Sequence, residues 1–178
     1  MPASAYLGRA STLAEELVKI LAVRGEMIAA AESCTAGLAA DFIARIPGAS
    51  GVFWGSFVVY TPDAKMRMLG VPGELLEKYG AVSRPVALAM AEEALKKSGA
   101  SWAFSVTGLA GPGGDSSAPV GTIWIGIAGR DGKAPDSIRS EAKLFFFSGS
   151  RNEVREAAAA AALEELLERV HHSDAGRY

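Results

Sequence analysis

A serine and a cysteine stand side by side in the stretch AAAESCTAGLAADF, residues 29–42. Either side chain could act as a nucleophile. If a helix begins there, its unpaired backbone N–H groups could also stabilise an oxyanion beside Ser33. The alternative interpretation is that Ser33 or Thr35 only caps that helix. Cys34 carries the intrinsically stronger nucleophile, and a helix N-terminus would lower its pKa. Position alone leaves open which of these residues does chemistry.

Lys65 is a candidate base for such a nucleophile. The sequence TPDAK predicts a helix start with Thr61 as its cap, which places the lysine in the first turn. The positive helix end and burial would both favour the neutral amine that a base requires. The two histidines of the chain stand at 171–172, in a predicted polar tail, so Lys, Tyr, Asp or Glu must supply a base. A solvated surface lysine is the alternative.

Two further segments could bind an anionic or amide ligand. The loop TGLAGPGG, residues 107–114, offers backbone N–H groups and close approach. It matches neither the GxGxxG nor the GxxxxGK[ST] pattern, so a structural turn is an equally good interpretation. Arg151 lies at the N-terminus of the last predicted helix and could pair with a phosphate there, although an exposed surface arginine is the alternative.

The elements around these residues predict how they come together. We expect strands over 27–31, 53–60 and 102–108, and a hairpin of two strands, 119–129 and 137–147, around Asp131-Gly132. Helical patterns cover the intervening segments, beginning with a capping box at Thr12 and Glu15 and ending with a helix over about 151–170. This order predicts a three-layer α/β/α domain on a mixed β-sheet, with ligands at the carboxyl ends of the strands.

Length and composition favour one soluble domain. We expect a single domain over residues 1–178, with a core at about 11–170 and flexible tails at 1–10 and 171–178. The 18 basic and 20 acidic residues give a formal charge of −2, which disfavours nucleic acid as a ligand. The single cysteine allows no internal disulfide, and no apolar run is long enough to span a membrane. We therefore predict a cytoplasmic protein that has no membrane partner.

Six motifs occur in one order along nearly the whole chain. They are AESCTAG (31–37), Tyr60 and Lys65 followed by LGV (69–71), GAVS (80–83), SVTGLAGPGG (105–114), PVGT (119–122) and SGSR (148–151). Together they resemble the C-terminal domain of the competence/damage-inducible protein CinA, a family that also occurs alone as nicotinamide mononucleotide deamidase. The resemblance extends from the first predicted helix to the last.

The resemblance implies an amidohydrolase that converts nicotinamide mononucleotide to nicotinic acid mononucleotide and ammonia. It implies no metal, no organic cofactor and a homo-oligomer. Ser33 would be the nucleophile, Lys65 its base, and Tyr60 would relay protons or orient the pair, while Cys34 would be a packed residue. The residues expected to bind the nucleotide substrate are Glu32, Thr35, Gly37, Thr107, Gly108, Gly111, Gly113, Thr122 and Arg151.

The chain departs from the family pattern at one position of the first motif. The family usually reads Cys-Thr-Gly-Gly, whereas this chain has Ala36 before Gly37, and the added methyl group could tighten the approach to a ligand. Longer family members also carry a domain similar to molybdopterin-binding proteins, whose activity we expect to be absent here. The alternative function is a non-catalytic nucleotide-binding or regulatory module linked to competence or DNA damage.

Overall fold

The computed structural model of the chain describes residues 3–113, 118–131 and 134–173. Five strands form one mixed sheet in the order β2-β1-β3-β4-β5. Strand β1 pairs in parallel with β2 and β3, and the β4-β5 hairpin continues the sheet in antiparallel fashion. The strands are β1 (Ile28–Glu32), β2 (Phe53–Val58), β3 (Trp102–Gly108), β4 (Thr122–Asp131) and β5 (Ala134–Phe146). The predicted mixed sheet is confirmed.

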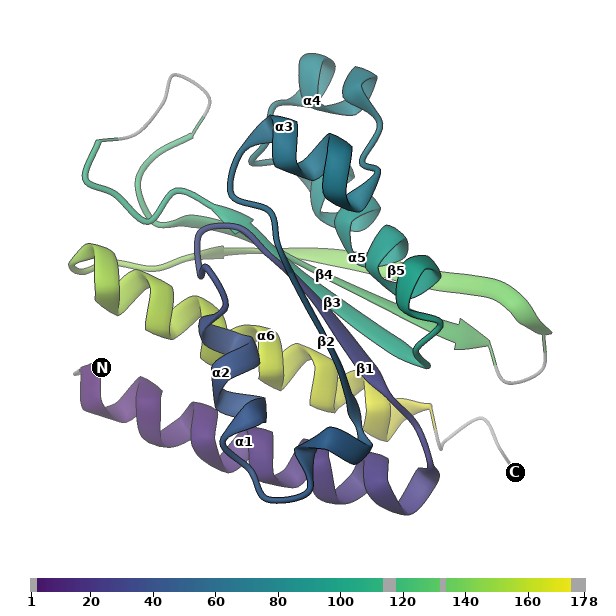
Figure 1. The fold of residues 1–178 in the computed structure, drawn as a ribbon. Coiled ribbons are helices and arrows are strands. Elements are labelled where there is room, and N and C mark those ends of the chain that lie inside the picture. The colour runs from purple at the N-terminus through teal and green to yellow at the C-terminus, as the bar shows by residue number, and fades with distance from the viewer. Residues whose placement is uncertain (1–2, 114–117, 132–133, 174–178) are drawn as a thin grey trace.

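Helices cover both faces of this sheet (Figure 1). One layer holds α1 (Ala3–Arg24), α2 (Leu38–Ala44) and α6 (Arg151–His172). The other layer holds α3 (Pro62–Ala64), α4 (Gly73–Tyr79) and α5 (Arg84–Ser98). A 3-10 turn, η1 (Ala49–Gly51), precedes β2, and a π-helical turn, η2 (Lys65–Leu69), continues α3. The three-layer architecture is therefore as predicted. No helix within the described ranges has the length and apolar character that crossing a membrane requires.

The two ends of the chain differ from the sequence prediction. Helix α1 begins at Ala3, so the expectation that residues 1–10 form a tail is wrong for residues 3–10. Thr12 lies inside the helix, where its hydroxyl donates to the carbonyl oxygen of Gly8 instead of capping. Tertiary packing extends the helix, because Ala10 is fully buried and Arg9 pairs with Glu164 of α6. Helix α6 likewise includes residues 171 and 172, which were expected in a tail.

Small side chains allow the layers to approach closely. Strand β1 is buried along its whole length, as expected for a parallel strand that helices cover on both faces. Ser105 of β3 donates a 2.6 Å hydrogen bond to the carbonyl oxygen of Ala87 in α5. A Cβ atom at Gly126 would lie 2.5 Å from that same oxygen, so only glycine fits there. This close packing fixes α5 against the middle of β3 and β4.

Candidate active site

Ser33 and Lys65 meet at the carboxyl ends of β1 and β2. The Lys65 Nζ atom lies 2.8 Å from the Ser33 Oγ atom and 3.0 Å from the carbonyl oxygen of Val59. Both residues are buried, with 7% of Ser33 and 1% of Lys65 exposed to solvent. The Ser33 hydroxyl also lies 3.4 Å from the carbonyl oxygen of Tyr60. A buried amine and a hydroxyl in direct contact can act as base and nucleophile.

The position of Lys65 follows from the local signals before it. The Thr61 hydroxyl accepts a hydrogen bond from the backbone N–H of Ala64, and Pro62 occupies the first helical turn, as the sequence predicts. The next residue, Lys65, enters the π-helical turn and points into the protein. Burial lowers the pKa of its amine from 10.5 to about 8. The alternative of a solvated surface lysine is therefore wrong.

Cys34 faces the apolar core instead of this pair. It is 5% exposed and belongs to the cluster that α1, α2 and α6 form on one face of the sheet. Burial raises the pKa of its thiol to about 11, so the thiolate is scarce at neutral pH. Ser33 hydrogen-bonds Lys65, whereas no hydrogen bond between the Cys34 thiol and Lys65 is present among the described residues.

The turn after Ser33 is longer than predicted, and a different residue caps the helix. Helix α2 starts only at Leu38, and its cap position, Gly37, offers no side chain. Instead, the fully buried carboxylate of Glu32 accepts hydrogen bonds of 2.9 to 3.2 Å from three backbone N–H groups at the start of α2, those of Gly37, Ala39 and Ala40. Glu32 therefore serves as a helix cap, and the geometry does not place it toward a ligand as expected. The predicted capping by Ser33 or Thr35 is also wrong.

The side chains of Tyr60 and Arg151 contact each other at the protein surface, and we call the surface formed by Tyr60, Gly111 and Arg151 the exposed rim. The Arg151 guanidinium donates to the Tyr60 hydroxyl at 2.5 Å and also to the carbonyl oxygen of Gly111. The Tyr60 side chain is 52% exposed, and it contacts Ser33 through its backbone carbonyl alone. The phenol is therefore not placed to relay a proton from the Ser33-Lys65 pair in this structure. The bridge joins the segment after β2, the glycine-rich loop and the start of α6.

The expected threonine ligands are buried. The Thr107 hydroxyl donates at 2.8 Å to the carbonyl oxygen of Ala81, which ties the end of β3 to the segment before α5. The hydroxyl oxygens of Thr35 and Thr122 are also buried, and neither has a hydrogen-bond partner among the described residues. A buried hydroxyl without a hydrogen-bond partner is energetically costly. The hydroxyl groups of Thr35 and Thr122 are therefore available to bind a polar group of a ligand.

The glycine-rich loop combines packing and unusual backbone geometry. At Gly108 a Cβ atom would lie 2.4 Å from the Ile123 side chain, so this glycine is required by the contact of β3 with β4. Gly111 and Gly113 have φ angles of +86° and +78°, which favour glycine. The last residue of the predicted loop, at position 114, lies outside the described residues. The start of the predicted loop, Thr107 and Gly108, is thus the end of strand β3, whereas Gly113 is exposed.

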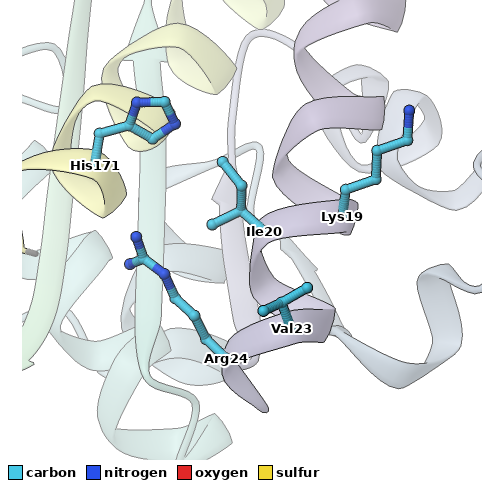
Figure 2. Close-up of a pocket in the computed structure, with 5 residues that line it drawn as sticks. All are labelled: Lys19, Ile20, Val23, Arg24 and His171. Atoms are coloured by element: carbon cyan, nitrogen blue, oxygen red, sulfur yellow. The ribbon is translucent and has the colours of Figure 1, made fainter.

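A separate hollow of about 500 Å³ lies between α1 and α6 (Figure 2). It is lined by Lys19, Ile20, Val23, Arg24 and His171, none of which belongs to the predicted site. Across residues 3–113, 118–131 and 134–173, no group of three or more His, Cys, Asp and Glu side chains is placed to hold a metal ion. The Ser33-Lys65 pair remains the candidate reactive centre.

The family relationship rests on most of the chain. The sequence model of the CinA C-terminal domain matches residues 10–170. The chain belongs to the CinA C-terminal domain family. A CinA-like protein of Anaeromyxobacter sp. strain K is 46% identical over 155 residues, which are 86% of this chain and 36% of that protein. A CinA-like protein of Chlorobaculum tepidum is 44% identical over 161 residues, 89% of this chain and 37% of that protein. The chain therefore spans little more than a third of the length of these relatives.

Solved structures of the CinA family have the same fold. A competence/damage-inducible protein of Agrobacterium tumefaciens is 40% identical, with a TM-score of 0.82 over 90% of this chain and 94% of its own. A competence damage-inducible protein of Klebsiella pneumoniae is 30% identical, with a TM-score of 0.85 over 92% of this chain and 98% of its own. The mixed sheet with helices on both faces is thus shared across CinA-family structures.

The structure of this CinA-family domain adds a residue that the sequence analysis missed. Arg155, one helical turn after Arg151, donates from Nε to the carbonyl oxygen of Cys34 at 3.1 Å and from Nη2 to that of Thr35 at 2.9 Å. The spacing of four residues between two arginines on α6 was a local signal that both face the same edge. The target carbonyl groups, however, are more than a hundred positions away in the sequence.

Proposed function

We propose that this chain is an amidohydrolase that converts the carboxamide of nicotinamide mononucleotide to the acid and releases ammonia. The observation that carries the proposal is the 2.8 Å contact between the Ser33 hydroxyl and the buried Lys65 amine, whose pKa is about 8. A hydroxyl beside an amine that is readily neutral is the arrangement that an acyl-transfer mechanism requires. The nicotinamide nucleotide is inferred from the resemblance of the six motifs to CinA.

In the first half of the reaction, neutral Lys65 accepts the proton of the Ser33 hydroxyl as Oγ attacks the carboxamide carbon. The carbon becomes tetrahedral and its oxygen takes up negative charge. The protonated lysine then gives its proton to the departing nitrogen, and the carbon–nitrogen bond breaks. Ammonia leaves, and Ser33 is esterified with the nicotinic acid mononucleotide.

In the second half, water takes the place of ammonia. Lys65 accepts a proton from the water as it attacks the ester carbon, and returns that proton to Ser33 as the ester bond breaks. The acid product leaves and both side chains regain their starting states. Burial of the amine supports this cycle, because it lowers the cost of the neutral form that both steps need.

In this proposal the exposed rim supplies the counterpart of the nucleotide phosphate. Arg151 carries a guanidinium that can form a bidentate pair with phosphate oxygens, and it already contacts the glycine-rich loop at Gly111. Binding would replace the contact between Arg151 and the Tyr60 hydroxyl with contacts to the ligand. In this arrangement the anionic end of the nucleotide lies at the rim and its amide lies near Ser33.

The test compares the wild-type chain with Ser33→Ala and, as a matched control, Cys34→Ala. Each protein is incubated with nicotinamide mononucleotide, and ammonia and nicotinic acid mononucleotide are both quantified. We expect turnover by the wild type and Cys34→Ala and its loss in Ser33→Ala. If the wild type binds the nucleotide without releasing ammonia, the proposal fails and a binding module becomes the better interpretation.

A further inference from the structure

The turn that carries Ser33 is held from two sides. On one side, the buried Glu32 carboxylate accepts the N–H groups at the start of α2 and lies 3.4 Å from the Ser56 hydroxyl of β2. On the other side, the Arg155 guanidinium binds the two successive carbonyl oxygens of Cys34 and Thr35. The Glu32 carboxylate therefore accepts hydrogen bonds from the N–H groups that follow the turn, and the Arg155 guanidinium donates hydrogen bonds to the carbonyl groups within it.

The backbone between these two contacts is strained. Ala36 has a φ angle of +53°, in the left-handed region that side-chain-bearing residues avoid. Such a conformation persists only where the surrounding structure imposes it. Arg155 binds the carbonyl groups of the two residues before Ala36, and Glu32 binds the N–H group of Gly37 directly after it, so together these contacts impose the conformation.

The hydrogen bonds of Arg155 indicate that its role is to hold the backbone of the turn. Its guanidinium donates to the two carbonyl groups and to the Asn152 side chain, and all of these partners are neutral oxygens. Fixing two adjacent carbonyl groups fixes two successive peptide planes, because each plane is rigid. The first of these planes begins at the Cα atom of Cys34, one peptide bond after Ser33, so holding both planes constrains the chain that leaves Ser33 and with it the direction of the Ser33 hydroxyl relative to Lys65.

We propose that Arg155 is a positioning residue of the amide hydrolysis, which acts by holding the strained turn so that the Ser33 hydroxyl meets Lys65. The inference rests on the proposed function. Arg155 reaches the reaction only through the backbone, since its contacts are with carbonyl oxygens and Asn152. Its loss therefore affects the chemical step and leaves binding of the nucleotide nearly unchanged.

The first experiment measures kcat and KM for nicotinamide mononucleotide in Arg155→Met and Arg155→Lys. Arg169→Met is the matched control, because Arg169 lies on the same helix and pairs with Glu141 of β5, away from Ser33. Because misplacing a reactive group by about 1 Å can cost on the order of 100-fold, we expect Arg155→Met to lower kcat by about 100-fold. KM should stay within about 2-fold, and lysine should restore part of the rate. An unchanged kcat, or a change confined to KM, contradicts the proposal.

A second variant tests the strain. Glycine adopts the left-handed conformation without steric cost, so Ala36→Gly should lessen the need for Arg155. In the Ala36→Gly background, we expect the loss of kcat caused by Arg155→Met to shrink by about 10-fold. Equal fold losses in both backgrounds would show that Arg155 does not act through the strained turn.

A readout without turnover separates this inference from the proposed function. Amide hydrogen exchange over residues 33–40 reports opening of the turn in any folded variant. We expect Arg155→Met to lose protection there while Arg169→Met retains it. If the wild type does not hydrolyse nicotinamide mononucleotide, the proposed function fails, yet this comparison still tests whether Arg155 holds the turn that carries Ser33. Equal exchange in the two variants would overturn the positioning role of Arg155.

Discussion

At the scale of single residues, burial gives Lys65 and Cys34 opposite chemical characters. Removing a lysine from water disfavours its charged form and lowers its pKa to about 8. Removing a thiol from water disfavours its thiolate and raises its pKa to about 11. The same physical effect therefore makes the amine available as a base near neutral pH and makes the thiol unreactive.

The pH dependence of catalysis should report the Lys65 amine. With a pKa of about 8, the neutral fraction is about one tenth at pH 7 and about nine tenths at pH 9. We expect kcat/KM for nicotinamide mononucleotide to rise about 10-fold over this interval and then level off. Lys65→Ala should lose both the rate and this ascending limb. A variant that retained the same limb would exclude Lys65 as the group that titrates.

The reactivity of Cys34 should report its burial. Because the thiol is 5% exposed and its pKa is raised to about 11, we expect alkylation of the native protein at pH 8 to be at least about 100-fold slower than that of the urea-unfolded chain. Mass spectrometry after iodoacetamide treatment measures both rates. Rapid alkylation of the native protein, accompanied by loss of activity, would return Cys34 to the candidate nucleophiles.

At the scale of elements, the short helix α2 depends on a cap that lies outside it. The Glu32 carboxylate binds N–H groups up to eight positions later, and no side chain at the cap position Gly37 could replace it. These bonds are made by a buried charged acceptor, which makes each of them stronger than a bond between neutral groups. The cap therefore stabilises the start of α2 and the turn before it together.

Glu32→Gln should weaken this element without changing its shape greatly. The amide keeps one acceptor oxygen but places an N–H₂ group against backbone donors, so we expect the free energy of unfolding to fall by about 2 kcal/mol. Urea unfolding of the variant and the wild type measures the difference. Glu153→Gln, which changes the cap of α6 at an exposed position, is the comparison for a surface capping carboxylate. Equal stability of Glu32→Gln and the wild type would contradict the capping role.

Sequence signals within a few residues, such as helix caps and turn residues, predicted the start of α3 and the β4-β5 hairpin correctly. The Thr61 cap and the adjacent Pro62 predicted the start of α3, and hence the position of Lys65, while the Asp131-Gly132 sequence pattern predicted the pairing of β4 with β5. Ser33 directly follows β1, and Lys65 lies in the helical segment that follows the neighbouring strand β2, so both come to the same edge of the sheet. The roles of these residues in catalysis stay predictions.

Interactions between distant segments determined what the sequence did not reveal. The start of α1 depends on its packing against α6, so the local capping box at Thr12 was misleading. The contact of Arg155 with Cys34 joins residues 121 positions apart, and no pattern within either segment specifies it. Glu32 was expected to bind the nucleotide because of the family resemblance. The sequence does not show that the backbone N–H groups of Gly37, Ala39 and Ala40 lie against its carboxylate.

At the scale of the whole molecule, the buried lysine influences stability as well as catalysis. Its pKa is about 8 in the folded chain, against an ordinary value of 10.5. Between these two pH values the unfolded chain binds more protons than the folded chain, so stability rises with pH. Below pH 8 the ammonium form is buried at a cost, and this cost disappears as the pH rises toward 10.5.

The measurement compares the free energy of unfolding of the wild type and Lys65→Met at pH 7, 9 and 10.5. We expect the wild type to gain up to about 3 kcal/mol relative to the variant between pH 7 and 10.5. The difference between the two proteins removes the titration of all other groups. A constant difference over this range would mean that the lysine has an ordinary pKa in the folded chain.

The last helix of the domain also determines when the site is complete. Ser33 and Lys65 belong to the first half of the chain, whereas Arg151 and Arg155 come from α6, which follows all five strands. Contacts over such sequence separations form late, because a long loop must close before they can be made. During refolding, a sheet and a buried Ser33-Lys65 pair could therefore form before α6 docks. Enzymatic activity should then recover more slowly than the secondary structure does. The delay between the two should equal the time that α6 takes to pack against the sheet.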